Sequence, residues 1–147
     1  MAAQSYTFTD RWFVAAGRER VYQVLEDVAG YPSWWPQVRA VAKVDQDTAL
    51  VACRSLLPYT LHFALARIRQ DPDHGVLEAT LDGDLVGTCR WRLAVVDGGT
   101  RVEFWQQVST PGRALRTAAR VTRPLLVLNH HLMMRGGRRG LAGRMSR

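Results

Sequence analysis

The strongest indication of the fold is the segment RALRTAARVTRPLLVLNHHLMMR, residues 113–135. When these residues are placed at steps of about 100°, the arginines fall in one narrow stripe and the apolar residues fall on the opposite side. The apolar side holds Leu115, Ala118, Ala119, Leu125, Leu126, Leu132 and Met133. The pattern predicts one amphipathic helix, bent at Pro124 and roughly 34 Å long, which is enough to cross a small sheet.

Two polar residues, Thr122 and Asn129, lie two turns apart in the middle of this apolar side. Polar residues on the inner face of such a helix indicate the lining of a cavity. Two interpretations stay open for each. The Asn129 amide either holds an oxygen of a ligand or bonds to a strand, and Thr122 either faces the cavity or bonds to a nearby carbonyl. His130 is expected at the boundary of the apolar side and His131 at the surface.

The chain before this helix is rich in alternating β-branched and aromatic residues, which are typical of strands. One strand is expected at residues 5–14, a helix at 18–28 and a helical turn at 33–35. Six more strands follow, and the short turns between them make neighbours antiparallel. These strands are expected at residues 38–44, 48–56, 59–69, 75–81, 85–95 and 101–109. The predicted fold class is α+β, with a curved seven-stranded antiparallel sheet around the long C-terminal helix and two short helices after the first strand.

Alternation within the strands predicts which side chains face the helix. In the last two strands and in the strand at 59–69, large apolar residues fall at every second position. The expected inner residues are Leu61, Phe63, Leu65, Gly87, Cys89, Trp91, Leu93, Val102, Phe104, Gln106 and Val108. His62, Glu78 and Glu103 are expected to point outward.

A chain of 147 residues is long enough for one domain, expected at residues 1–135. Residues 136–147 are rich in Arg and Gly and are expected to form a flexible tail. No apolar run reaches the ~18 residues of a membrane span, and the N-terminal residues show no targeting pattern, so a cytoplasmic location is expected. The two cysteines, Cys53 and Cys89, fit small core positions. Nothing in the spacing of Cys and His predicts a metal site, and no cofactor is expected.

The positive charge is concentrated at the C-terminal end. Residues 1–110 hold 11 Lys and Arg against 13 Asp and Glu, whereas residues 111–147 hold 9 Arg and no acidic residue. Such a segment either stays soluble as an exposed helix or makes weak contact with an anionic membrane surface. No nucleic-acid partner is expected, because no aromatic residue interleaves with these arginines.

Four segments carry a resemblance to a known family. They are YPSWWPQV (31–38), GDLVGTCRW (83–91), GGTRVEFWQQV (98–108) and LNHHLMMRG (128–136). In their order and spacing they resemble the START-like, helix-grip (SRPBCC) superfamily, and more narrowly its bacterial polyketide cyclase/dehydrase group, over about residues 5–140. The resemblance implies a sheet wrapped around the C-terminal helix with a hydrophobic tunnel between them, used for lipids, polyketides and plant hormones. Where the group's helix motif has an acid after Asn-His, this chain has His131, so no role of that acid carries over.

The candidate ligand-binding residues follow from these patterns. Tyr31, Trp34 and Trp35 form an aromatic cluster that either closes one end of the cavity and stacks on a planar ligand or locks the short helices to the sheet. Arg54 either guards the entrance and anchors an anionic ligand or forms a surface ion pair. The full candidate set is Trp35, Arg54, Phe63, Trp91, Phe104, Gln106, Thr122 and Asn129. The cavity is expected to exceed ~300 Å³, with its entrance between the final helix and the loops near Trp35, Pro58 and Gly83.

Three functions are compatible with this sequence. The first is binding of a hydrophobic small molecule, lipid or polyketide-like, under the last helix. The second is an aromatic polyketide cyclase or dehydratase, for which no catalytic residue is identified: the chain has no nucleophile elbow or phosphate loop, and few titratable residues face inward. The third is an interaction module that uses the basic end of the helix at a membrane or at a partner. The oligomeric state does not follow from the sequence.

Overall fold

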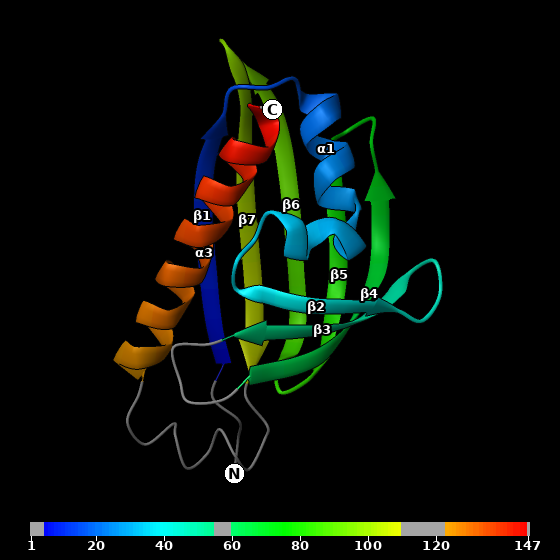
Figure 1. Cartoon of the computed structure of the whole chain (residues 1–147), viewed down its shortest axis with the longest axis vertical. Coiled ribbons are helices and arrows are strands. Elements are labelled where there is room, and N and C mark those ends of the chain that lie inside the picture. Colours follow the sequence, from blue (N-terminus) through cyan, green and yellow to red (C-terminus); the bar gives the residue numbers. More distant parts are fainter. Residues whose placement is uncertain (1–4, 55–59, 110–122, 147) are drawn as a thin grey trace.

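The computed structural model describes residues 5–54, 60–109 and 123–146. They form one seven-stranded antiparallel sheet, two short helices and one long helix (Figure 1). The strands are β1 (Ser5–Val14), β2 (Val38–Lys43), β3 (Thr48–Arg54), β4 (Thr60–Asp71), β5 (Val76–Gly83), β6 (Val86–Val96) and β7 (Gly99–Ser109). The helices are α1 (Arg18–Glu26), the 3₁₀ helix η1 (Val28–Ser33) and α3 (Arg123–Met145). The predicted α+β helix-grip fold is confirmed.

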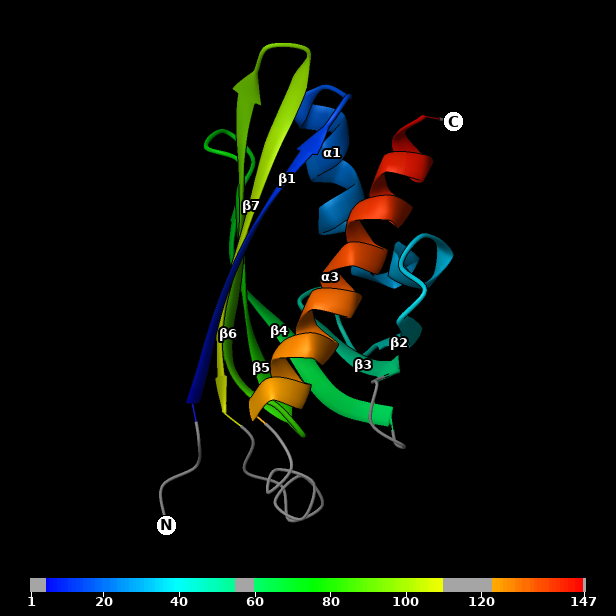
Figure 2. The ribbon, with the colours of Figure 1, turned by 90° about the vertical axis from the view of Figure 1, so that its left-hand side faces the viewer.

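The sheet follows the chain except at its first strand. Its order is β1-β7-β6-β5-β4-β3-β2, so β1 pairs with the last strand and β1 and β2 form the two edges. Tight turns make the meander possible: Gly98, in the turn between β6 and β7, has φ = 80°, a conformation that glycine adopts without steric cost. Figure 2 shows all the helices on one side of the curved sheet.

The core lies on the concave side of the sheet, as the alternation predicts. Trp91, Leu93 and Phe104 are buried there, whereas His62 is exposed. α1 adds Val21, Tyr22 and Leu25, which are buried because their spacing places them on one helix face. The first strand contributes Trp12 and Val14, and the second short helix ends beside Trp34 and Trp35. Most of the buried residues form one cluster with these side chains.

The expected flexible tail is wrong. α3 continues through Gly136 to Met145, and the side chains of Leu141 (0% exposed) and Met145 are buried. Burying a leucine completely stabilises the fold by about 1.5–3 kcal/mol, which is enough to order a helix end. Arg20 completes this end, because its guanidinium donates a hydrogen bond to the Met145 carbonyl (3.1 Å), one of the last carbonyls of the helix.

Glycine is the reason that the C-terminal half of α3 packs so closely. A Cβ atom at Gly140 would lie 1.6 Å from the Trp34 carbonyl oxygen, and one at Gly137 would lie 2.7 Å from the Trp35 ring. Only residues without a side chain allow the helix to approach η1 at this distance. In the sequence, Gly137 and Gly140 suggested a frayed tail. In the structure they are the residues through which the helix contacts Trp34 and Trp35.

The buried face of α3 also differs from the predicted one. The buried residues are His130, Met134, Gly137, Leu141 and Met145, whereas Leu132, expected inside, is 39% exposed. The face is therefore rotated, because it follows the C-terminal contacts rather than the leucines before residue 127. Residues 113–122 of the predicted helix lie outside the described part of the chain. Among the described residues, no helix has the length and apolar content needed to cross a membrane.

Candidate functional site

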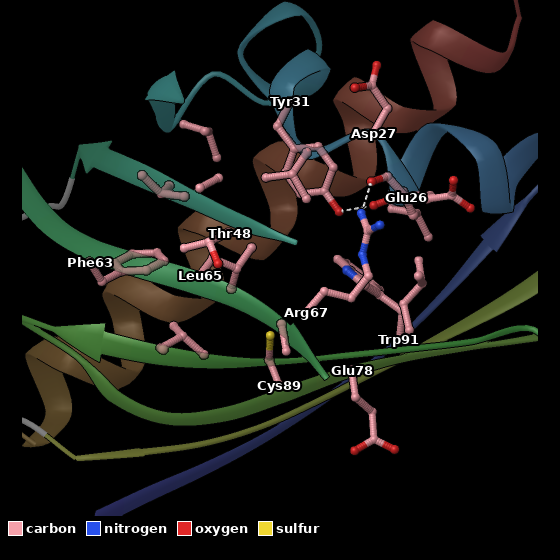
Figure 3. A pocket seen from close by; sticks show the side chains of 18 of the residues that line it. Glu26, Asp27, Tyr31, Thr48, Phe63, Leu65, Arg67, Glu78, Cys89 and Trp91 are labelled. Atoms are coloured by element: carbon pink, nitrogen blue, oxygen red, sulfur yellow. Dashed lines mark hydrogen bonds between the residues drawn. The ribbon is translucent and has the colours of Figure 1, made fainter. Parts of the chain in front are cut away.

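A cavity lies between the concave face of the sheet and the layer formed by η1, β2 and β3 (Figure 3). Its volume is about 150 Å³. That is smaller than the ~300 Å³ expected for a ligand site, and is the size of a cavity that accepts one aromatic ring. The apolar wall contains Leu25, Val38, Val51, Cys53, Phe63, Leu65, Leu77, Leu81, Cys89, Trp91, Phe104 and Met133. Of the described residues of α3, only Met133 takes part.

Aromatic rings form one end of the cavity. The ring centroids of Trp91 and Phe104 are 4.6 Å apart, those of Trp35 and Trp91 are 6.3 Å apart, and Tyr31 lies 5.8 Å from Trp35. The polar atoms of two of these rings bond to backbone. The Trp35 indole donates to the Met133 carbonyl (2.9 Å) and the Tyr31 hydroxyl donates to the Leu25 carbonyl (2.5 Å). This end therefore offers aromatic faces to a ligand and keeps its own donors satisfied.

The two tryptophans of the YPSWWPQV segment have different positions. Trp35 lines the cavity, whereas Trp34 is buried outside it against Gly140 of α3. Trp34 therefore packs the short helix against α3, whereas the sequence interpretation had this cluster lock the short helices to the sheet. Trp35 lies at the end of the cavity, as the other interpretation expects.

Arg67 is a charged residue that lines the inner wall. It lies on β4 with Phe63 and Leu65, is half-buried, and its guanidinium extends toward the Tyr31 hydroxyl (Figure 3). One nitrogen donates to the Glu26 carbonyl (2.9 Å) and another to the Gln70 side chain (3.3 Å). Arg67 was not among the residues predicted to line the cavity. The alternation of Leu61, Phe63 and Leu65 continues to it and could have placed it on the inner face.

Exposed polar residues mark the mouth of the cavity. Asp27 follows α1, and Lys43, Gln46 and Asp47 belong to β2 and the turn after it; all four are exposed and all line the cavity. The cavity thus opens between the end of α1 and the β2–β3 turn. The expected entrance was elsewhere: Gly83 does not line the cavity, and Pro58 lies outside the described residues. Glu78 borders the wall from β5, but its carboxylate points away from the cavity (Figure 3).

The cavity contains two thiols in apolar surroundings. Cys53 and Cys89 are both free, and both line the wall. Burial raises the pKa of each thiol to about 12. Burial likewise raises the pKa of Tyr31 above its usual value of 10.0. At neutral pH these groups are therefore protonated, and none of them is a nucleophile or a general base.

These raised pKa values predict a loss of stability in alkaline solution. Unfolded thiols release their protons near pH 9.0, whereas the folded ones hold them to about pH 12. The contribution to the free energy of unfolding is therefore complete below pH 9.0 and falls between these values, by up to about 1.4 kcal/mol per pH unit for each thiol. Urea unfolding on both sides of pH 9.0 measures this slope. The Cys53→Ala/Cys89→Ala variant should show a shallower slope, and an unchanged slope would contradict the assignment.

The structure brings five of the eight candidate residues to the cavity. Trp35, Phe63, Trp91, Phe104 and Gln106 line it together. Arg54 is exposed at the end of β3 and does not line this cavity, and its role at an entrance, one of the two interpretations left open, stays a prediction. Asn129 is half-buried on the flank of α3 and is not part of the wall either, because the helix is rotated. Thr122 lies outside the described residues.

A buried pair formed by His130 and Asp10 was not predicted from the sequence. His130, expected at a boundary, is buried, and its Nε2 lies 2.7 Å from the Asp10 carboxylate of β1. Its ring stacks on Phe8, with centroids 3.9 Å apart. Asp10 lies on the inward side of β1 with Phe8 and Trp12, because the three residues are two positions apart in the strand. This alternation could have predicted its inward position. The pair lies outside the cavity wall and ties α3 to the sheet edge.

Solved structures with the same fold are numerous. The aromatase/cyclase Zhui from a Streptomyces species is 18% identical, with a TM-score of 0.78 over 98% of this chain and 95% of that one. A START superfamily protein from Mycobacterium smegmatis is 16% identical, with a TM-score of 0.72 over 97% of both chains. The di-domain aromatase/cyclase StfQ of the steffimycin pathway is 14% identical, with a TM-score of 0.70 over 97% of this chain and 51% of that one. At these identities the likeness establishes the fold.

Sequence comparison adds a family-level match. A family model described as "Polyketide cyclase / dehydrase and lipid transport" matches residues 14–145. No curated protein sequence matches the chain. The family match runs from Val14, the last residue of β1, to Met145 at the end of α3, and so includes the helix end that was expected to be a tail.

Proposed function

The chain belongs to the polyketide cyclase/dehydrase and lipid-transport family, and on that premise we propose that it binds a planar hydrophobic small molecule carrying one polar oxygen. The observation that supports this is the position of Arg67 beside the apolar and aromatic side chains of the inner wall of the cavity. The aromatic end takes the ring of the ligand, and the guanidinium takes its oxygen. A cavity of about 150 Å³ encloses one ring, so the rest of a larger ligand extends through the mouth.

The position of Arg67 favours an oxygenated ligand over a plain hydrocarbon. A half-buried guanidinium needs acceptors, and it already bonds to the Glu26 carbonyl and to Gln70. Arg carries five donors, so donors remain for a ligand oxygen. A hydrogen bond from a charged donor contributes about 1.5–3 kcal/mol where the surroundings are apolar. Lys43 and the carboxylates of Asp27 and Asp47 lie at the mouth, where water weakens their contribution.

Replacing Arg67 with methionine should separate these ligand types. Binding of 2-naphthol should weaken about tenfold or more, which corresponds to the loss of one charge-assisted hydrogen bond, while binding of naphthalene should change little. Titration followed by tryptophan fluorescence measures both affinities, since Trp35 and Trp91 line the cavity.

Arg69→Met is the matched control. Arg69 lies two positions further along β4, but a register shift between Arg67 and Arg69 interrupts the alternation of the strand, and Arg69 pairs with Asp71 and Glu78 on the exposed side. The Arg69→Met variant should therefore bind 2-naphthol and naphthalene with the same affinities as the wild-type protein. Equal losses for naphthol and naphthalene in Arg67→Met would contradict a polar contact with the ligand. No binding of either probe to the wild-type protein would contradict the proposed function as a whole.

A second candidate function is an aromatic cyclase or dehydratase, and the same arginine favours it. A guanidinium beside the Tyr31 hydroxyl in an apolar cavity would stabilise the enolate that forms when a poly-ketone cyclises. Tyr31 is not the base, because it is protonated and bonded to the Leu25 carbonyl. Faster formation of an aromatic product from a poly-β-ketone, lost in Arg67→Met, would support this reaction. Binding without any increase in rate would leave a carrier.

A further inference from the structure

The solvent-facing side of α3 combines exposed leucines with arginines. Leu128 is 48% exposed and Leu132 is 39% exposed, one turn apart. Arg135 and Arg139 are also exposed and fall within about 60° of the two leucines around the helix axis. We call these four residues the outer stripe of α3. The leucines occupy its N-terminal half and the arginines its C-terminal half.

No acidic residue balances the outer stripe. α3 contains five arginines and neither Asp nor Glu. Within the described part of the chain, the ion pairs join Arg11, Arg69, Arg101, His74 and His130 to carboxylates, and no arginine of α3 takes part. Exposed His131 and Arg138 flank the stripe on one side. The stripe is therefore a positively charged surface with an apolar end.

We propose that the outer stripe of α3 binds the surface of an anionic lipid bilayer. Leu128 and Leu132 enter the boundary between headgroups and acyl chains, and Arg135 and Arg139 bind lipid phosphates. Because the leucines lie at one end of the outer stripe and the arginines at the other, the helix is tilted in the bilayer surface, with its Leu128 end deeper. The contact is peripheral, because the opposite face of α3 is buried against the rest of the fold.

Charge selects the bilayer over other occupants of the outer stripe. In a dimer of two parallel stripes the arginines of one copy would face the arginines of the other, which is repulsive. In an antiparallel dimer they would face the leucines of the other copy, so neither arrangement gives the arginines a negative partner. A nucleic acid would match the arginines but leave the leucines in contact with a charged backbone. An anionic bilayer matches both halves of the stripe. In Figure 1, α3 and the β2–β3 turn lie at opposite sides of the molecule, so the contact leaves the mouth of the cavity accessible.

Vesicle flotation tests the proposal directly. The wild-type protein should float with vesicles of mixed phosphatidylglycerol and phosphatidylcholine at low ionic strength, bind pure phosphatidylcholine weakly, and dissociate as salt is added. Arg135→Glu/Arg139→Glu should lower the partition coefficient at least about tenfold. Leu128→Ser/Leu132→Ser should lower it about fivefold or more, since the apolar anchor is lost. Both variants change exposed positions and should still bind 2-naphthol.

Two control variants distinguish the outer stripe from the overall charge and from general surface hydrophobicity. Arg11→Glu/Arg92→Glu makes the same change of charge on exposed residues of β1 and β6, and Val44→Ser/Leu50→Ser removes exposed apolar residues near and on β3. Both should float like the wild type. Equal losses in the controls, or no flotation of the wild type, would overturn the proposal. So would a dimer in light scattering that Leu128→Ser/Leu132→Ser abolishes, because the stripe would then be a protein interface.

Discussion

Replacing Trp91 with alanine should lower the free energy of unfolding by about 3–5 kcal/mol, the usual loss for a large aromatic side chain removed from a core. Trp91 is 6% exposed and touches aromatic rings on three sides, with centroid distances of 4.6 Å to Phe104, 5.3 Å to Trp12 and 6.3 Å to Trp35. Its ring joins the cavity wall to β1 and to the segment after η1, so the hole left behind cannot close by a movement of one neighbour. Urea unfolding of both proteins measures the difference.

Trp105→Ala provides the matched control. Trp105 lies on β7 opposite Arg90, on the convex side of the sheet, and is only half-buried. Its main described contact is with the Arg90 guanidinium, 5.1 Å from the ring centroid. Removing this contact should cost about 1 kcal/mol. A loss for Trp91→Ala as small as that for Trp105→Ala would mean that the concave side is not the core.

Gly140→Ala should destabilise the protein by about 3 kcal/mol, at the upper end of the cost of adding a methyl group to a packed site. The new Cβ would lie 1.6 Å from the Trp34 carbonyl oxygen. Because that atom is backbone, no rotamer change can make room, and α3 must move away from η1. The movement would also expose Leu141 and Met145, which are buried beside it. Urea unfolding measures the loss, and hydrogen exchange should show faster exchange in the last turns of α3.

Gly143→Ala is the control for the helix itself. A Cβ at Gly143 would meet no atom within 4 Å. Alanine in a helix is more favourable than glycine by about 0.5–1 kcal/mol, so this variant should be slightly more stable than the wild type. Opposite signs for two glycines three positions apart would identify close packing as the cause. A neutral Gly140→Ala would show that α3 does not pack against η1 as described.

The cavity wall was largely predictable because strands have a simple period. Successive side chains point to opposite faces, so the position of Phe63 predicts that of Leu65, and the pattern also holds for Trp91 and Phe104. The same rule reaches Arg67 and Asp10, which were missed because a charged residue on an inner face was not expected there. Alternation says nothing, however, about how closely the opposite layer approaches. The volume of the cavity and the position of its mouth depend on that approach.

The final helix shows where sequence periodicity stops being sufficient. A helical wheel predicts an apolar side, but the direction of that side depends on which residues are included. Here the leucines before residue 127 set the predicted direction, and the glycines after residue 135 were left out. In the structure, the face that packs is set by Gly137, Gly140 and Leu141. Glycine scores as a helix breaker in the sequence because its cost is local, whereas its benefit appears only when another backbone comes near.

The order of the strands from β2 to β7, their antiparallel pairing and the side of the sheet that carries the core could be read from the sequence. These three features follow from the period of side chains and from turn residues, which act between neighbours in the chain. The resemblance to the family rested instead on four short segments. The pairing of β1 with β7, the rotation of α3, the packing of its C-terminal half, the position of Arg67 beside Tyr31 and the bond between His130 and Asp10 required the tertiary structure. Each of these joins residues far apart in the chain, and none of the residues carries a local preference for its partner.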